Sequence, residues 1–366
     1  MIVKSSLPIL ILLLLAGFRL DTEPGRKPMF FTMGEEWKLA IREREVFTFQ
    51  SQDTLLYHSV SLLSDTTGNP LLFFADLETP VCADGECKLA NIKIYWNLLG
   101  NYVGYGTSPK FPLTKYEHDP FDHDDYARLH HLLLDDNSIL RRKKISDLVD
   151  RVPAETYKPG FGKVDGMSGA TKKEIKEAVV DGGLYSCYTL WHLVHGEVKK
   201  QMIAYLESIH SEALNHYFLY TPYEDYQAYA LKQLDKENFS AHTQQIISIF
   251  KEGSPLIRTY ILKKMPVSVL NDQGVTAQLF GIFPSLDVNT KTLLIKKMDT
   301  ADATAAQLLA KHVTAMTKNQ LRNYLGFLDD NPGCLTPSVT ADLMEITRSR
   351  EYAYNYLIKV FFDNKK

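Results

Sequence analysis

The residues best suited to chemistry form a short run from Asp165 to Thr171, in which small residues end in a threonine hydroxyl. The spacing of the next residues, Lys172 to Val180, predicts a helix that begins beside Thr171. Unpaired backbone N–H groups and the positive end of a helix dipole favour a phosphate group at such a place. The run also fits an ordinary helix start, in which Ser168 or Thr171 is the N-cap.

The run matches the pattern D-x-x-[ST]-G-A-T-x-[ST] at five positions. The matching residues, which are the expected cofactor-binding residues, are Asp165, Ser168, Gly169, Ala170 and Thr171. Here the chain resembles the FMN-binding domains in which a threonine carries FMN through a phosphoester bond. These include the covalent-flavin subunits of the sodium-pumping NADH:quinone reductase and of the related Rnf complex. Where that family commonly has Ser or Thr two residues after the acceptor, this chain has Lys173.

The resemblance implies that FMN is attached covalently to Thr171. A separate magnesium-dependent flavin transferase would attach it from FAD, outside the cytoplasmic membrane. The chain would then relay electrons between redox partner proteins, with the cofactor supplying the redox chemistry. Aromatic cover for the flavin ring could come from residues near this domain's sheet and helices, although each also fits ordinary packing. These aromatic residues are Trp96, Tyr102, Tyr105 and Trp191.

The N-terminus predicts export of the chain. A short basic start, Met1 to Lys4, precedes a twelve-residue apolar run from Leu7 to Phe18. A run of this length is typical of a signal peptide, whereas spanning a bilayer takes about 20 residues. A buried N-terminal helix is the alternative. We therefore expect a periplasmic or otherwise extracytoplasmic protein that meets a membrane only through a partner or an uncleaved N-terminus.

The cysteines fit an exported protein. Cys82 and Cys87 enclose the turn-like tetrapeptide Ala-Asp-Gly-Glu between two strand-like runs, and an oxidising compartment favours a disulfide between them. Their spacing matches neither a redox-active C-x-x-C pair nor a four-ligand zinc site. Cys187 lies in a helical pattern and Cys334 in a loop bounded by Pro and Gly, so both are expected to be free, buried or inert rather than catalytic.

Length, composition and charge limit the class of protein. A chain of 366 residues predicts two domains at about 150 residues each. Its 45% hydrophobic and 23% charged residues are ordinary for globular domains. The formal net charge of −3 gives no bulk attraction to nucleic acid or to anionic membranes. The expected divisions are a signal peptide at 1–18, a linker at 19–34, an FMN-binding-like α+β domain at 35–200 and a helical repeat domain at 201–366.

The first domain is expected to combine an antiparallel sheet with helices. Aromatic and branched residues separated by turn sequences predict strands. The strand-like runs are Leu55 to Leu63, Pro70 to Val81 and Leu89 to Tyr105. Helical spacing then follows in three stretches. These are Asp124 to Asp135, Lys172 to Val180, and a stretch that begins near Leu184 and continues towards Glu207.

The second domain contains a short recurring pattern. Five segments can be aligned at intervals of 30 to 34 residues, which suits two helices and two turns per unit. The segments are Tyr229 to Asp235, Tyr260 to Pro266, Leu293 to Asp299, Asn323 to Asp329 and Leu357 to Asp363. We expect an α-solenoid resembling HEAT-type repeats, with a non-repetitive helical bundle as the alternative. Such a domain would dock partners, so a flavin-free extracytoplasmic scaffold is the competing function.

A dense His/Asp stretch from His118 to His131 could be interpreted as a metal site or as part of an extracytoplasmic hydrolase. Its spacing fits no standard zinc motif, and the residues from Asp124 onward are explained by a helix start. Structural or surface roles are therefore expected for the stretch. His192 and His195 could share one helix face with a cofactor, but an amphipathic helix explains them equally well. No catalytic residue and no metal ligand is assigned.

Overall fold

The computed structural model describes residues 27–51, 56–81, 89–108, 110–115, 119–151, 169–171, 173–349 and 351–365. The expected signal peptide, residues 1–18, and the expected disulfide between Cys82 and Cys87 lie outside these ranges. The chain divides into two compact units, Met1–Ile209 and His210–Lys366. Below they are called the first unit and the helical unit.

The first unit is built on a six-stranded antiparallel sheet, counted over the described residues, with the order β1-β6-β5-β4-β3-β2. The strands are β1 (Phe30–Phe31), β2 (Arg42–Gln50), β3 (Tyr57–Ser64), β4 (Pro70–Pro80), β5 (Leu89–Trp96) and β6 (Tyr102–Thr107). The three predicted runs therefore form β3, β4 and the β5–β6 hairpin. The sequence did not predict β1 or β2, and β1 shows that Phe30 and Phe31, at the end of the expected linker at 19–34, belong to the sheet. β1 joins the sheet by pairing with β6.

The predicted run from Leu89 to Tyr105 is interrupted by a tight turn. The side-chain oxygen of Asn97 accepts hydrogen bonds from the backbone N–H groups of Leu99 and Asn101, both at 3.0 Å. Gly100 has a φ of +72°, a conformation that glycine adopts without steric cost. The chain thus reverses between β5 and β6 instead of continuing as one strand.

A second turn, between β3 and β4, is closed by Asp65. Its carboxylate accepts hydrogen bonds from the backbone N–H groups of Thr67 at 2.8 Å and Asn69 at 2.9 Å, and from both of their side chains. Slight desolvation opposes ionisation, but these hydrogen bonds outweigh it and lower the pKa of Asp65 from 3.8 to about 2. The carboxylate form therefore stabilises the turn.

This turn predicts a pH dependence of stability. Because the pKa of Asp65 is lower in the folded chain, its contribution is complete above pH 3.8 and is lost as the pH falls through about 2. Asp65→Ala is expected to lower the unfolding free energy at neutral pH by about 1 kcal/mol. On acidification, the unfolding free energy of the variant should fall less than that of the wild type. Urea unfolding at neutral and acidic pH measures both effects. An equal loss in Glu78→Ala, which removes an exposed carboxylate from β4, would contradict the prediction.

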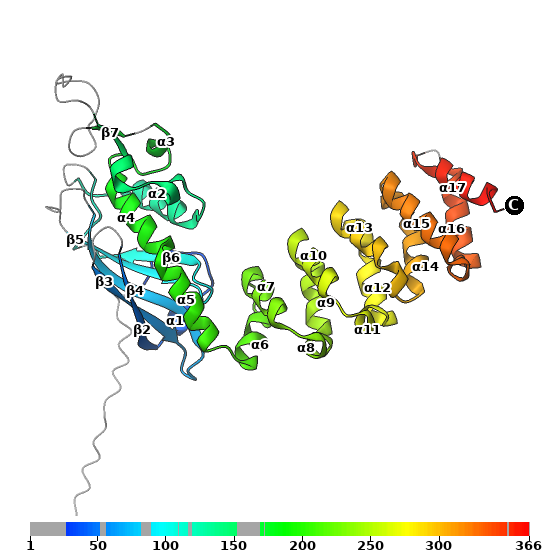
Figure 1. The fold of residues 1–366 in the computed structure, drawn as a ribbon, viewed down its shortest axis with the longest axis horizontal. Coiled ribbons are helices and arrows are strands. Elements are labelled where there is room, and N and C mark those ends of the chain that lie inside the picture. Colours follow the sequence, from blue (N-terminus) through cyan, green and yellow to red (C-terminus); the bar gives the residue numbers. More distant parts are fainter. Residues whose placement is uncertain are drawn as a thin grey trace, which may run out of the picture. The chain divides into compact units, whose positions relative to one another are not determined.

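Helices α2 (His123–Leu134), α4 (Leu184–His195) and α5 (Glu197–Ser208) cover one face of the sheet, as the green and cyan helices show in Figure 1. The other helices described in this unit are α1 (Glu36–Leu39) and α3 (Lys173–Lys176), with 3-10 turns at Ile139–Arg142 and Ile145–Asp147. α2 contacts β6 and α5 contacts β2. Because α5 packs on this sheet, the division between the units falls after it, beyond residue 200.

The helix expected from Leu184 towards Glu207 is two helices. Gly196 separates α4 from α5, and a Cβ at this position would lie only 2.4 Å from the carbonyl oxygen of His192. In the broken conformation that the chain adopts at residue 196, with a ψ of −144°, an ordinary side chain would clash with this carbonyl, so the break requires glycine. The glycine therefore marks a break that the hydrophobic spacing alone did not reveal.

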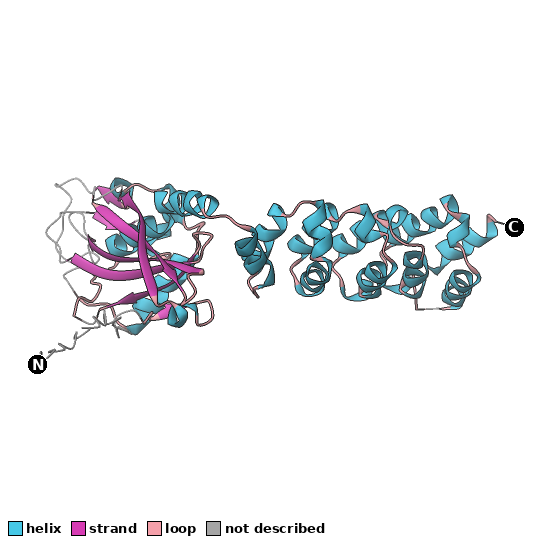
Figure 2. Cartoon of the chain, turned by 90° about the horizontal axis from the view of Figure 1, so that it is seen from below, coloured by secondary structure: helices cyan, strands magenta, loops and turns pink. Residues whose placement is uncertain are grey.

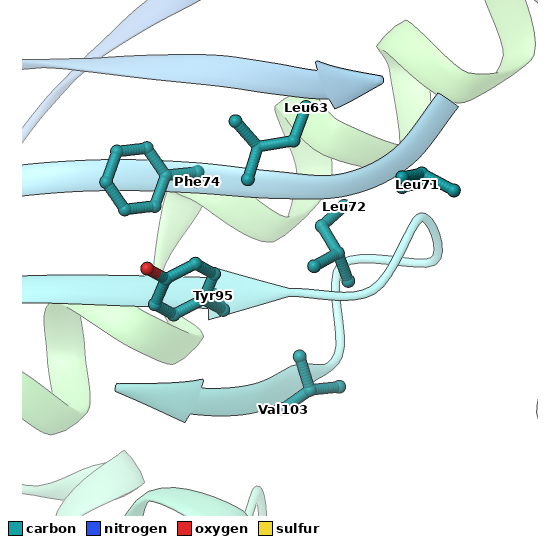
Figure 3. Close-up of a cluster of buried hydrophobic side chains, with 6 residues drawn as sticks. All are labelled: Leu63, Leu71, Leu72, Phe74, Tyr95 and Val103. Atoms are coloured by element: carbon teal, nitrogen blue, oxygen red, sulfur yellow. The ribbon is translucent and has the colours of Figure 1, made fainter. Parts of the chain in front are cut away.

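The other face of the sheet carries a separate apolar cluster, shown in Figure 3. Its buried members come from four neighbouring strands. They are Leu63, Leu71, Leu72, Phe74, Tyr95 and Val103. The partly buried side chains that pack against them are Phe31, Met33, Trp37 and Ala40. The segment between β1 and β2, which includes α1, therefore covers the centre of this face.

The helical unit consists of stacked helices joined by short turns (Figure 1, Figure 2). Its helices are α6 (Glu212–Tyr220), α7 (Glu224–Gln233), α8 (Lys236–Ala241), α9 (Thr243–Glu252), α10 (Pro255–Lys264), α11 (Val267–Leu270), α12 (Gln273–Gly281), α13 (Val288–Lys296), α14 (Thr304–Lys311), α15 (Lys318–Asp330), α16 (Pro337–Arg348) and α17 (Asn355–Asp363). One layer follows the contacts α9–α12–α14–α16, and the other follows α7–α10–α13–α15–α17. Helices α6–α7, α9–α10 and α16–α17 pack across the layers.

The recurring sequence segments all fall in the second of these layers. Each segment covers the end of α7, α10, α13, α15 or α17. The residue five places before the end of each segment has no exposed surface. These residues are Ala230, Ile261, Leu294, Tyr324 and Ile358. The repeated sequence pattern therefore corresponds to the same buried position in successive helices.

Candidate functional site

Gly169, Ala170 and Thr171 form the short strand β8 (Gly169–Thr171), which pairs antiparallel with β7 (Val149–Arg151). In this ladder Thr171 lies opposite Val149. Asp165 and Ser168, the other two residues of the motif match, lie outside the described residues. Thr171 thus lies at the end of a paired segment, two residues before the start of a helix at Lys173.

The helix after Thr171 is shorter than its sequence predicts. α3 ends at Lys176, whereas the spacing predicted a helix to Val180. After α3, the Ala178 N–H donates to the Ile175 carbonyl at 3.0 Å, three residues earlier, as in a 3-10 turn. The next residues, Val179 and Val180, are buried in the core. A single turn has only a weak dipole, so the expectation of phosphate binding by a long helix is corrected. Any phosphate here would depend on the backbone of the motif itself.

The segment after Thr171 is nevertheless held firmly. Ile175 of α3 is fully buried, and Glu174 beside it forms an ion pair with the ammonium of Lys143 at 2.8 Å. The guanidinium of Arg128 on α2 donates to the Glu177 carbonyl at 2.8 Å. These contacts fix the backbone from Glu174 to Glu177, shortly after Thr171. Sequence reasoning missed Lys143 and Arg128, because only the folded chain brings them to this segment.

The four aromatic residues expected near a flavin ring are all core residues. Each is at most 6% exposed, and the polar atom of each already has a partner. Trp96 Nε1 donates to the Val194 carbonyl at 3.0 Å and Trp191 Nε1 to the Asp135 carbonyl at 2.9 Å. The hydroxyls of Tyr102 and Tyr105 bond to His130 Nδ1 and the Tyr126 carbonyl, each at 2.8 Å. The packing interpretation holds, so these residues do not offer an open face for a ring.

The described part of the His/Asp stretch has structural roles. Asp122 caps α2 by accepting from the backbone N–H groups of Asp124 and Asp125 at 2.9 Å. His130 is buried and stacks on Phe30 with ring centroids 4.9 Å apart. Burial, with a smaller effect of the neighbouring His131, lowers the pKa of His130 to about 4, so it is neutral at neutral pH. Within the described ranges no group of three or more His, Cys, Asp or Glu side chains could hold a metal ion.

His192 and His195 fasten α4 to its neighbours. His192 Nε2 donates to the Leu140 carbonyl at 3.2 Å, and His195 Nε2 donates to the Leu133 carbonyl at 2.8 Å at the end of α2. Cys187 is buried on the same helix and accepts a hydrogen bond from the Val180 backbone N–H at 3.4 Å. These contacts explain the three side chains as parts of the core. They do not require a cofactor on this helix.

Comparison with known proteins adds no relative. No family model, curated protein or solved structure matches the chain. Among the described residues, no helix is both long enough and apolar enough to cross a membrane. The proposal below therefore depends on the motif that ends at Thr171 and on the segment in which the structure places it.

Proposed function

We propose that this chain is an exported flavoprotein that carries FMN covalently on Thr171 and relays electrons between redox partner proteins. The residue-for-residue match of the motif is the observation that carries this proposal. Two structural features support it. Thr171 ends a backbone ladder with β7, and the nearby Glu174 and Glu177 are held to Lys143 and to α2. A fixed attachment segment suits a cofactor that must keep a constant position.

The attachment of FMN to Thr171 is a phosphoryl-type transfer from FAD, in which nothing is oxidised or reduced. The hydroxyl oxygen of Thr171 bonds to the phosphorus of the FMN half of FAD. The pyrophosphate bond of FAD breaks, AMP leaves, and the threonine proton is lost to solvent. The small residues Gly169 and Ala170 leave the backbone open to a bulky group. Once bound, the flavin supplies one- and two-electron chemistry, and the protein supplies its position.

The helical unit would provide the docking surface. Its two layers of stacked helices and its recurring buried positions support a solenoid of the HEAT type. In the same way, the antiparallel sheet with helices on one face supports an FMN-binding-like domain in the first unit. A repeat domain presents a long surface without needing a catalytic pocket. It would hold the flavin domain near its electron donor or acceptor.

The competing function is a flavin-free extracytoplasmic scaffold that acts through its helices. The burial of Trp96, Tyr102, Tyr105 and Trp191 favours this alternative, because none of these rings is open to a flavin. The short helix α3 favours it as well. In that case the motif would be a structural remnant. Both functions share the docking role of the helical unit and differ only in the cofactor.

The test of the proposal is flavin retention by the full chain. Protein produced with export in cells that contain a flavin transferase is expected to be yellow. It should keep an absorbance near roughly 450 nm after denaturation and gel filtration. Thr171→Val removes the acceptor hydroxyl and should abolish the retained colour completely. Peptide mass spectrometry should find the mass of FMN, less one water, on the peptide that contains Thr171.

The matched control is Thr314→Val, which makes the same chemical change at an exposed threonine of the helical unit. It should keep the full flavin content. Colourless wild-type protein with an unmodified Thr171 peptide under these conditions would refute the flavin proposal. That result would leave the scaffold as the function.

A further inference from the structure

The second layer of the helical unit has an uneven charge distribution. α10 and α13 together contain Arg258, Lys263, Lys264, Lys291 and Lys296, and neither helix contains Asp or Glu. The whole chain, in contrast, has a net charge of −3. Positive charge is therefore concentrated on two adjacent helices in the middle of the layer. A concentration of this kind needs an explanation beyond general solubility.

Some of these cations are used inside the fold. Lys264 Nζ donates to the carbonyls of Leu231 and Lys232 at the end of α7, the nearer contact being 2.5 Å. Arg258 donates to two carbonyls at the end of α9, those of Phe250 and Lys251. Cations at the C-terminal ends of neighbouring helices stabilise the stack, because those carbonyls lack partners within their own helices. Lys264 and Arg258 are thus explained by packing of the repeats.

Four other cations are not used in this way. Lys232, Lys263 and Lys296 occupy the same register position, three residues before the end of three successive recurring segments. Arg322 lies one helical turn earlier in the equivalent stripe of α15. All four side chains are exposed, and none forms an ion pair or side-chain hydrogen bond within the described part of the chain. We call these four residues the basic row.

The basic row runs across four helices that contact one another in sequence, α7–α10–α13–α15. Packed helix axes lie about 8–10 Å apart, so the row extends over roughly 30 Å. Two exposed aliphatic side chains accompany it. Leu256 is 79% exposed two turns before Lys263, and Val288 is 58% exposed two turns before Lys296. The outward face of α10 and α13 therefore pairs a solvent-exposed aliphatic group with a solvent-exposed cation on each helix.

We propose that the basic row is a docking surface for an acidic protein partner. This inference rests on the docking role of the proposed function and does not depend on the flavin. Charge of one sign selects a partner of the opposite sign and speeds its encounter, while Leu256 and Val288 supply apolar contacts. A protein surface fits better than a lipid bilayer, because interfacial helices insert a broad apolar face. Only two aliphatic side chains accompany this row, and the sequence has no Trp after Trp191.

The experiment uses the full chain and fluorescently labelled poly-L-glutamate as an acidic polypeptide probe. Because the chain is negative overall, binding of this probe requires a local positive surface. The double variant Lys263→Glu with Lys296→Glu is expected to weaken binding at least about tenfold, and added salt should weaken the wild-type affinity. The matched control, Lys311→Glu with Arg348→Glu, makes the same charge change on exposed residues of α14 and α16. It should change the affinity less than about twofold.

Three outcomes would overturn the inference. Equal losses in both double variants would show that bulk charge, and not the basic row, holds the probe. Absence of wild-type binding would exclude the basic row as a docking surface for an acidic partner. Binding to phosphatidylglycerol vesicles, but not to poly-L-glutamate, would assign the row to a lipid surface. Flavin content is measured in the same samples, so colourless protein that still binds through the row would refute only the flavin proposal.

Discussion

Trp96→Ala is expected to lower the unfolding free energy of the first unit by about 3–5 kcal/mol. Trp96 ends β5 with no exposed surface, and its indole N–H donates to the Val194 carbonyl at 3.0 Å. Val194 lies in the last turn of α4, where carbonyls have no donor within the helix. The substitution would therefore leave both a cavity between sheet and helix and a carbonyl without its partner. Urea unfolding measures the loss, and hydrogen exchange should locate it in peptides from β5 and α4.

Trp37→Ala is the matched control for this prediction. Trp37 is half-buried on α1 and packs on the other face of the same sheet. Trp37→Ala should lower the unfolding free energy clearly less than Trp96→Ala, because water already reaches part of the Trp37 side chain. Trp96→Phe keeps most of the side-chain volume but loses the N–H donor. Its loss of unfolding free energy should lie between those of Trp96→Ala and Trp37→Ala. A loss in Trp96→Ala no larger than in Trp37→Ala would show that the contact with α4 does not hold the unit together.

The central strands could be predicted because their residues show strand composition between clear turn sequences. β4 and β5 are such strands, and α2 follows its predicted span closely. β2 was not predicted, because it forms one edge of the sheet and its first four residues, Arg42 to Glu45, are exposed and charged, so they lack the apolar pattern of a strand. β1 has only two residues and becomes a strand by pairing with β6. Edge strands owe their structure to their neighbours more than to their own sequence.

The candidate site could be located from the sequence but not assembled from it. Thr171 was found through a motif of a few adjacent residues. The contacts that hold its surroundings join residues far apart, with Lys143 31 positions from Glu174 and Arg128 49 positions from Glu177. Burial likewise could not be seen in advance, so aromatic residues such as Trp191 were candidates for flavin cover until the structure placed them in the core.

The repeated helices were visible in the sequence because equivalent residues return to the same buried position. The break at Gly196 was not visible, because a single glycine inside an apolar helical pattern also occurs in continuous helices. The aligned segments place Tyr324 where the other repeats have Ala230, Ile261, Leu294 and Ile358. They could not show that its hydroxyl is buried and bonds to the Ala306 carbonyl.

Tyr324→Ala is expected to lower the unfolding free energy of the helical unit by about 3–5 kcal/mol. The Tyr324 side chain is fully buried in α15, and its hydroxyl donates to the Ala306 carbonyl of α14 at 2.7 Å. It therefore joins the two layers through both packing and a hydrogen bond. Burial raises the pKa of Tyr324 far above its usual value, so the hydroxyl remains a donor at any pH used for the measurement.

Tyr324→Phe separates these two contributions, because it keeps the ring and removes only the donor. Its expected cost is about 1 kcal/mol, since the Ala306 carbonyl also lies within a helix that can supply another donor. Asn323→Ala, an exposed change on the same helix, should stay within about 0.5 kcal/mol of wild type. Hydrogen exchange in α14 and α15 should be fastest in Tyr324→Ala, slower in Tyr324→Phe and slowest in Asn323→Ala. If Tyr324→Phe cost as much as Tyr324→Ala, the hydrogen bond rather than the buried ring would join the layers, and the position would not be equivalent to the apolar positions of the other repeats.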